Sequence, residues 1–434
     1  MRPRWIVVAA WLVFLLYAYP GYLPTSGVDQ LASAYRDAFQ DPQAAIMIEL
    51  WRTVCLAMSG PAGMLLLQSG LLVAGSFVVF ARAWPARTAA YATAGMLLAP
   101  PVLATTAVIA TESQMVGFLA AAIACLTSPR RAVRLLGLAA CVIACGIQTG
   151  GPVATLPIVV LGFAWRIDRG WRRYAIAGAT WLGVALLAAG LAHLLVDEDW
   201  RTTELTRAAV DVVGTLAHAP ALDDAHARDA LAGVPVRGAD LQARARQQHG
   251  DPVRFAEGSD ALLVWPTERS AIDATIDARA RLARAYPGAY LAHRADVFAR
   301  VLGLRDTEGW EPVYTDFLDA RGNREIVAHD ARHSPVQKLL TAPVRALGGT
   351  PVFWPVIYAA LAVVLLALAF RWRERWIAIV LASGLAFEAS LFATVAIPQF
   401  RQSHWLIASV VMSAIWLGLR WRGRRADDRR TLSG

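Results

Sequence analysis

Long apolar runs alternate with short basic loops along this chain, and this alternation predicts a bundle of membrane-spanning helices. About ten apolar segments can be distinguished, at residues 5–23, 60–81, 88–110, 114–127, 135–148, 152–165, 174–196, 352–370, 376–397 and 405–419. A straight helical span needs about 20 apolar residues, so the shorter segments must be tilted or shielded by other helices. The pattern predicts an all-α polytopic membrane protein.

Two longer polar stretches interrupt the apolar pattern. Within residues 25–51, Leu31, Tyr35 and Phe39 repeat at helical spacing, and a second apolar stripe begins near Ala44, after Pro42. These stripes predict a pair of short juxtamembrane helices lying flat at the membrane surface. The second stretch, residues 197–347, is large enough for a separate domain. Helical periodicity predicts that it is mostly helical, at residues 202–216, 225–231, 270–286 and 290–302.

The loop charges predict how the chain is oriented. Clusters of arginine occur before the first apolar segment and at every second junction after it, and the intervening junctions are not basic in this way. The positive-inside rule then places both termini in the cytoplasm. We expect four parts: a bundle of about seven spans (1–196), a periplasmic domain (197–347), a three-span bundle (348–420) and a basic tail (421–434). Residues 1–19 resemble a signal peptide but are predicted to be an uncleaved anchor, because no small-residue cleavage site follows.

Composition agrees with this assignment. The chain has 434 residues, of which 56% are hydrophobic, and a net charge of +9. Such a charge could suggest nucleic-acid binding, but the arginines cluster in short loops, where they report orientation instead. The four cysteines show no metal-ligand spacing. Walker A, Rossmann GxGxxG, HExxH and GxSxG motifs are absent from the sequence, so ATP-driven and serine-hydrolase chemistry has no support.

Five charged or titratable residues near the outer surface carry the candidate chemistry, because a charge beside lipid is costly. Asp29 lies just before the first surface helix, Glu112 lies in a short turn and Glu388 lies within the ninth segment. Arg401 and His404 lie in the turn before the tenth segment. A carboxylate can take a proton from a hydroxyl or hold a metal ion, and a guanidinium can grip a phosphate. The two acids outside the spans are thus catalytic candidates, and the other three are substrate-binding candidates.

Each of these residues also has a structural alternative. Asp29 could cap the helix that begins beside it, and Glu112 could be a solvated turn residue. Glu388 could make a structural hydrogen bond to a neighbouring helix. Arg401 could pair with Glu388 or extend to the membrane surface, and His404 could be an interfacial packing residue.

Three stretches of the sequence carry a family resemblance. They are SGVDQLASAY with DPQAAIMIELWR and GPAGMLLLQ (26–68), YPGAYLAHRADVFARVLGL (286–304) and LASGLAFEASLFATVAIPQFRQSHWLI (381–407). Together they resemble the GT-C superfamily of integral-membrane glycosyltransferases, in particular bacterial lipopolysaccharide-core, aminoarabinose and protein-mannosyl transferases. The resemblance implies that Asp29 is the first-loop acid and Glu112 a second outer-loop acid. It also implies that Arg401 and His404 face the phosphate of a donor.

The resemblance implies transfer of a sugar from a polyprenyl-phosphate donor to an envelope glycan or glycolipid, on the periplasmic side of a bacterial inner membrane. Gln30 and Asp41 are assigned to substrate binding with the residues above. No particular cofactor is required, although Asp29 and Glu112 could hold a divalent metal ion.

The sequence also departs from its relatives. An Asp-x-His-Pro-Pro segment is replaced by DPQAA at 41–45, a polar and often Arg-containing turn reads QTGG at 148–151, and Gln402 replaces a commoner Tyr. These changes leave room for an altered substrate or for lost activity. The alternatives are a flippase or other transporter of lipid-linked sugars, and a non-catalytic scaffold with a degenerate transferase fold.

Overall fold

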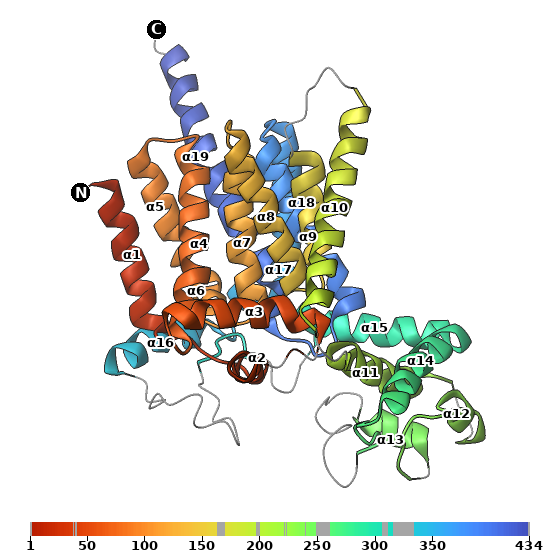
Figure 1. Ribbon diagram of the computed structural model, residues 1–434. Coiled ribbons are helices and arrows are strands. Elements are labelled where there is room, and N and C mark those ends of the chain that lie inside the picture. The colour runs from red at the N-terminus through yellow and green to blue at the C-terminus, as the bar shows by residue number, and fades with distance from the viewer. Residues whose placement is uncertain are drawn as a thin grey trace.

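The computed structural model is an apolar helical bundle with additional helices at one end (Figure 1). It describes residues 2–37, 39, 41–162, 170–196, 200–220, 222, 224–238, 240–248, 261–305, 311–315 and 334–432. Within these ranges there is no β-strand, and the only extended pairings are two isolated bridges, Tyr22 with Val108 and Val236 with Leu263. The prediction of an all-α protein is confirmed for the part that the structure describes.

In the part of the chain that the structure describes, eleven helices form the bundle. They are α1 (Pro3–Ala18), α4 (Ala62–Ala81), α5 (Ala86–Leu97), α6 (Pro100–Thr106), α7 (Thr111–Leu126), α8 (Arg131–Ile147), α9 (Gly151–Gly162), α10 (Arg172–Leu194), α17 (Pro355–Arg371), α18 (Arg375–Thr394) and α19 (His404–Leu432). Within the described ranges, four helices are long and apolar enough to cross a membrane, namely those that contain Ala62–Ala81, Arg172–Leu194, Arg375–Thr394 and Phe400–Arg424. The chain is therefore a multi-pass membrane protein.

One predicted span is wrong. Residues 88–110 were expected to form a single helix, but the chain forms α5 and α6 there, separated by a break at Leu98 and Ala99. The cause is the pair Pro100–Pro101, because proline cannot donate the backbone hydrogen bond that a continuing helix needs. The second helix starts instead with Pro100 at its first position, where a missing N–H is harmless.

Close backbone contact holds the middle of the bundle together. A Cβ atom added at Gly75 of α4 would lie 2.5 Å from the carbonyl carbon of Ala120 on α7, so only glycine fits there. Small residues at such crossings let two membrane helices approach closely. A buried amide pair crosses the same interface, since Gln114 Nε2 donates to Gln68 Oε1 at 3.0 Å.

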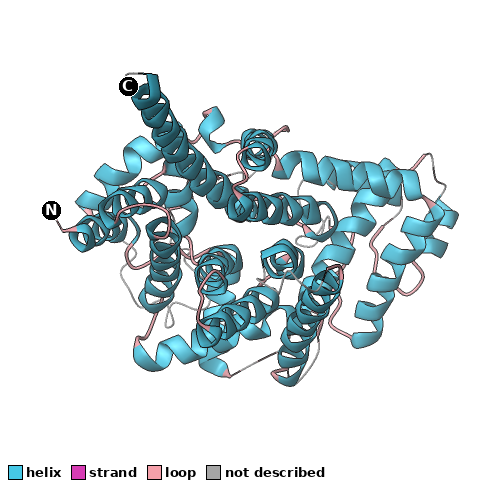
Figure 2. Cartoon of the chain, turned by 90° about the horizontal axis from the view of Figure 1, so that it is seen from above, coloured by secondary structure: helices cyan, strands magenta, loops and turns pink. Residues whose placement is uncertain are grey.

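The outer helices gather at the end of the bundle that is opposite both termini (Figure 1). Near the bundle lie α2 (Thr25–Arg36), α3 (Pro42–Ala57) and α16 (Pro335–Leu347). The others are α11 (Thr202–His218), α12 (Asp224–Ala230), α13 (Leu241–Gln248), α14 (Arg269–Ala285) and α15 (Pro287–Val301). These five lie to one side of the bundle in both views (Figures 1 and 2).

Four of these five helices, α11–α14, share a hydrophobic core of their own, whereas Val297 and Val301 of α15 belong to the core of the bundle. The buried members of the separate core include Val212 and Leu216 of α11, Leu241 of α13 and Leu282 of α14. The helical periodicity read from residues 202–216, 225–231, 270–286 and 290–302 corresponds to α11, α12, α14 and α15. We name these five helices the outer helical group. Its inner edge, formed by α11 and α15, meets the end of α18 and completes the site described next.

Candidate active site

A cavity of about 960 Å³ lies where the bundle, the first loop and the outer helical group meet. Its walls come from α2, the start of α3, the α6–α7 and α8–α9 turns, the start of α11, the end of α18, and the 3-10 helix η3 (Phe400–Ser403). Five of the seven residues predicted from the sequence line this cavity: Asp29, Gln30, Asp41, Glu112 and Arg401. Segments that are far apart in the sequence therefore meet in one place.

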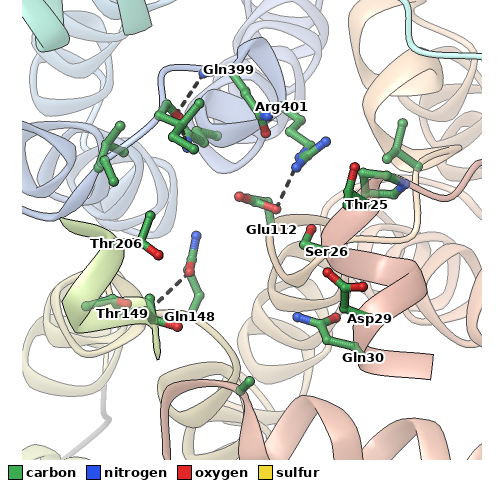
Figure 3. Close-up of a pocket in the computed structure, with 18 of the residues that line it drawn as sticks. Thr25, Ser26, Asp29, Gln30, Glu112, Gln148, Thr149, Thr206, Gln399 and Arg401 are labelled. Carbon is green, nitrogen blue, oxygen red and sulfur yellow. Dashed lines mark hydrogen bonds and ion pairs between the residues drawn. The ribbon is translucent and has the colours of Figure 1, made fainter. Parts of the chain in front are cut away.

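Helix α2 forms one wall of the cavity (Figure 3). Thr25, Ser26, Asp29 and Gln30 share the cavity-facing side because residues four apart lie on the same face of a helix. The helix already begins at Thr25, so Asp29 lies inside it and the capping alternative is wrong. The opposite face is tightly packed, since a Cβ atom at Gly27 would lie 2.9 Å from the Ile109 carbonyl oxygen. Partial burial raises the pKa of the Asp29 carboxyl.

Glu112 and Arg401 face each other across the cavity floor (Figure 3). Glu112 lies in the first turn of α7 and is only 7% exposed, so it is not a solvated turn residue. Its Oε2 atom lies 3.8 Å from Arg401 Nε, which is too long for a hydrogen bond. Arg401 Nε is buried and has no hydrogen-bond partner among the described residues. The guanidinium therefore keeps donors for a ligand, and it faces Glu112 rather than Glu388.

Glu388 and His404 lie behind the cavity wall. Glu388 is 3% exposed and accepts a hydrogen bond from Ser403 Oγ at 2.8 Å. His404 is fully buried, with its Nε2 atom 3.2 Å from the Thr106 hydroxyl. Neither residue lines the cavity, so their positions do not support direct contact with a substrate. Both contacts instead fix η3, the turn that carries Arg401.

Asp41 joins the first loop to the outer helical group. Its Oδ1 atom accepts from the backbone N–H of Gln43 at 2.9 Å and so caps α3. Its Oδ2 atom accepts from the N–H of Thr203 at 2.7 Å and from the Thr203 hydroxyl at 2.5 Å. Three hydrogen bonds thus engage a carboxylate that the sequence assigned to substrate binding. Its predicted role toward substrate stays a prediction.

The sequence analysis missed the contribution of α11 to the cavity. The cavity is also lined by Thr203, Thr206 and Arg207 of this helix. Thr206 lies across the cavity from the α2 wall (Figure 3). Arg207 Nε is buried without a hydrogen-bond partner among the described residues. Burial lowers the pKa of Arg207, and the nearby Arg279 lowers it further. The i, i+4 spacing of Thr203 and Arg207 was a visible signal, but nothing in the sequence showed that this end of the helix folds back to the membrane.

The cavity therefore combines carboxylates with two guanidinium groups whose Nε donors have no hydrogen-bond partner among the described residues. Asp29 and Glu112 can take a proton or bind a cation, and Arg207 and Arg401 can bind an oxyanion. Among the residues that the structure describes, no group of three or more His, Cys, Asp or Glu side chains could hold a metal ion. Such a mixture of acids and cations suits a reaction in which a proton is removed and a phosphate departs.

Comparisons with known proteins give a distant structural likeness. No protein-family model matches the chain, and no curated protein matches it either. A crystal structure of ArnT from Cupriavidus metallidurans bound to undecaprenyl phosphate is similar with a TM-score of 0.34 and 15% identity, covering 95% of this chain and 79% of that one. The apo structure of the same protein gives a TM-score of 0.31 and 16% identity, covering 94% and 76%. At these values the likeness assigns no activity to this chain.

Proposed function

We propose that this protein is a GT-C-type membrane glycosyltransferase, which moves a sugar from a polyprenyl-phosphate donor to a glycan or glycolipid of the cell envelope. One observation carries the proposal. Asp29, Glu112 and Arg401, which come from three distant segments, line one cavity at the end of an apolar bundle. A donor with an apolar tail in the bilayer would present its phosphate and sugar at this level.

The proposed reaction inverts the configuration of the sugar. The Asp29 carboxylate takes the proton from an acceptor hydroxyl, and the oxygen attacks the anomeric carbon as the bond to the phosphate oxygen breaks. The electron pair of that bond leaves with the polyprenyl phosphate. The raised pKa of Asp29 favours this role, because a stronger base takes a proton more readily near neutral pH. General-base catalysis of this kind contributes roughly 10²- to 10⁴-fold.

Arg401 is placed to stabilise the departing phosphate. A guanidinium offers two parallel N–H donors to a phosphate, and charge-assisted bonds of this kind are the stronger ones. Glu112, 3.8 Å away, orients Arg401 without consuming its donors. If the protein uses a divalent ion, Asp29 and Glu112 would hold it. Two carboxylates suit a hard cation that takes its remaining ligands from water and phosphate.

We also propose that the cavity is periplasmic, that both termini are cytoplasmic and that about ten spans cross the inner membrane. Both termini lie at the end of the bundle opposite the cavity (Figure 1). Arg82, Arg130 and Arg371 follow α4, precede α8 and end α17, all junctions that the positive-inside rule assigns to the cytoplasm. Four shorter apolar helices, α1, α7, α9 and α17, would add to the four long ones as tilted or shielded spans. Helix α8 and the broken pair α5–α6 would bring the number to about ten.

A non-catalytic scaffold is the second candidate. It is favoured by the DPQAA segment, where the expected His and prolines are missing, and by Asp41, whose carboxylate is already engaged in holding α3 and α11. A scaffold would keep the cavity without transferring sugar. A flippase would instead change the sidedness of a lipid-linked sugar and leave the glycans chemically unaltered.

Mass spectrometry of envelope glycolipids and polysaccharide tests these functions. A deletion strain is compared with strains that express the wild type, Asp29→Asn or the control Asp37→Asn, an exposed residue at the end of α2. We expect loss of one sugar unit on deletion, and restoration by the wild type and by Asp37→Asn only, at equal protein levels. Restoration by Asp29→Asn would remove the assigned base. No change in any glycan on deletion would refute the transferase.

A further inference from the structure

A buried charge cluster lies between the outer helical group and the end of α18. Arg294 of α15 donates from Nη1 to Asp211 Oδ1 at 3.0 Å, and His293 Nε2 lies 3.3 Å from the same oxygen. Arg294 also donates from Nε to the carbonyl of Phe392 at 2.7 Å and from Nη2 to that of Leu391 at 3.3 Å. The three charged or titratable side chains are almost completely buried. The cluster thus ties α11, α15 and the last turn of α18 together.

The position of Asp211 explains why a nearby cation stays unpaired. Arg207 precedes Asp211 by four residues on α11, the spacing at which opposite charges on a helix pair readily. In the structure Asp211 Oδ1 is turned to Arg294 and His293 of α15 instead. No hydrogen bond or ion pair of Arg207 is found among the described residues, and its Nε atom is buried at the cavity wall.

We infer that Arg207 binds an oxyanion of the ligand, a phosphate group, from the outer-helix side of the cavity, and that Arg294 keeps Arg207 available by holding Asp211 away from it. This inference rests on the proposed function of the same site. Arg207 is a binding residue, and Arg294 is a positioning residue that does not touch the ligand.

The chemistry of this wall fits a phosphate. Arg207 feels the charges of Asp211 and Glu204 but has no hydrogen-bonded carboxylate among the described residues. A partly buried guanidinium of this kind gains most from an oxyanion that it can bind through two N–H groups. The hydroxyls of Thr203 and Thr206, which also line the cavity, add neutral donors beside it. Arg401 belongs to the membrane part and Arg207 to the outer helical group. A phosphate that reaches both would bridge these two parts of the chain.

Ligand binding by the full chain in detergent tests the role of Arg207. Native mass spectrometry compares the binding of undecaprenyl phosphate with that of undecaprenol, which has the same tail without the phosphate. A second arm of the experiment measures the binding of inorganic phosphate. Arg207→Gln should weaken phosphate-dependent binding on the order of ten- to a hundredfold and leave undecaprenol binding unchanged. Arg281→Gln, the same change at a residue of α14 that does not line the cavity, should leave both unchanged.

The two arms identify the source of the oxyanion. If Arg207→Gln loses only the binding of undecaprenyl phosphate, Arg207 binds the lipid donor. If the variant loses the binding of inorganic phosphate, Arg207 binds a free phosphate. Wild-type binding by Arg207→Gln in both arms overturns the inference. If Arg401→Gln loses the phosphate preference while Arg207→Gln keeps it, the proposed function stands and the inference fails. If the wild type itself shows no preference for phosphate, the proposed function fails as well.

A rescue experiment tests the role of Arg294. Arg294→Gln should release Asp211 to pair with Arg207, and so weaken phosphate binding as much as Arg207→Gln does. Adding Asp211→Asn to Arg294→Gln removes the negative charge that would pair with Arg207, and should restore phosphate binding. A merely structural role predicts no such rescue. Circular dichroism and size-exclusion chromatography show that each variant is folded, and a folded double variant that still binds weakly refutes the positioning role.

Discussion

Replacing Asp41 by Asn should separate the two contacts that this carboxylate makes. Oδ1 caps α3 through Gln43, and Oδ2 holds the first turn of α11 through Thr203. Asn keeps one side-chain oxygen and caps helices about as well as Asp. Its amide nitrogen would then point at the N–H of Thr203, which needs an acceptor. We therefore expect α3 to keep its cap and α11 to lose its link to the first loop.

The size of the effect follows from the surroundings of the two partners. A hydrogen bond to a charged acceptor contributes about 1.5–3 kcal/mol. Asp41 is 7% exposed, but Thr203 is exposed, so water can replace the lost acceptor. The low end of the range applies, and we expect a loss of about 2 kcal/mol in the local opening free energy. At 1.4 kcal/mol for each factor of ten, this corresponds to about 30-fold faster amide exchange.

Hydrogen–deuterium exchange with mass spectrometry measures the rate of amide exchange in the full chain in detergent. Peptides that contain the first turn of α11 should exchange faster in Asp41→Asn, while those from the first turn of α3 should not. Asp37→Asn is the matched control, because Asp37 is exposed and its ion pair with Arg52, at 3.3 Å, lies at the surface. Unchanged exchange in α11, or faster exchange in α3 alone, would refute the assigned link.

The remaining predictions concern His293 and Asp29. Gly214→Ala should destabilise the outer helical group by about 1–3 kcal/mol, because the added Cβ would meet His293 Nδ1 at 1.9 Å, whereas Gly288→Ala, in open space, should not. Burial lowers the pKa of His293, although Asp211 opposes the shift. Below about pH 6.5 the unfolded chain then binds a proton that the folded chain excludes. The unfolding free energy should therefore decrease as the pH is lowered through this range, and it should decrease less in His293→Gln. Partial burial raises the pKa of Asp29, so transfer should be lost on acidification at a pH above the ordinary value of about 3.9.

Each of these predictions has an outcome that contradicts it. Equal thermal midpoints for Gly214→Ala and Gly288→Ala would mean that His293 can move aside without cost. A pH dependence of unfolding that is unchanged in His293→Gln would assign it to another group. An acid limb of the transfer rate that follows an ordinary aspartate, or that survives in an active Asp29→Asn variant, would exclude Asp29 as the base.

The local pattern of the sequence predicted the two helices of the first loop, but not the whole apolar stripe, because α2 ends at Arg36, before Phe39, and Tyr35 is exposed. Leu31 packs into the core from α2, and the second helix starts at Pro42, two residues before the predicted start near Ala44. Apolar periodicity and proline act within a few residues, so they can be read without the fold. The candidate charges Asp29, Glu112 and Arg401 could be chosen for the same reason, because each stands out against an apolar neighbourhood.

What could not be predicted depends on contacts between distant segments. Pairing with Glu388 was one alternative considered for Arg401, but Glu388 accepts a hydrogen bond from Ser403, and Arg401 faces Glu112. Arg207 looked like an ordinary helix arginine in a polar block. Its place at the cavity depends on α15 docking against α18, and this docking uses backbone carbonyls that carry no sequence signal.

The link between Asp41 and Thr203 has a consequence for how the chain is made. Its two partners are 162 positions apart, and the contact between Thr106 and His404 spans 298. During synthesis the first loop therefore leaves the insertion machinery long before Thr203 has been made, and α6 long before His404. The first loop and the bundle reach their final contacts only after α11 and the last helix, respectively, have been inserted.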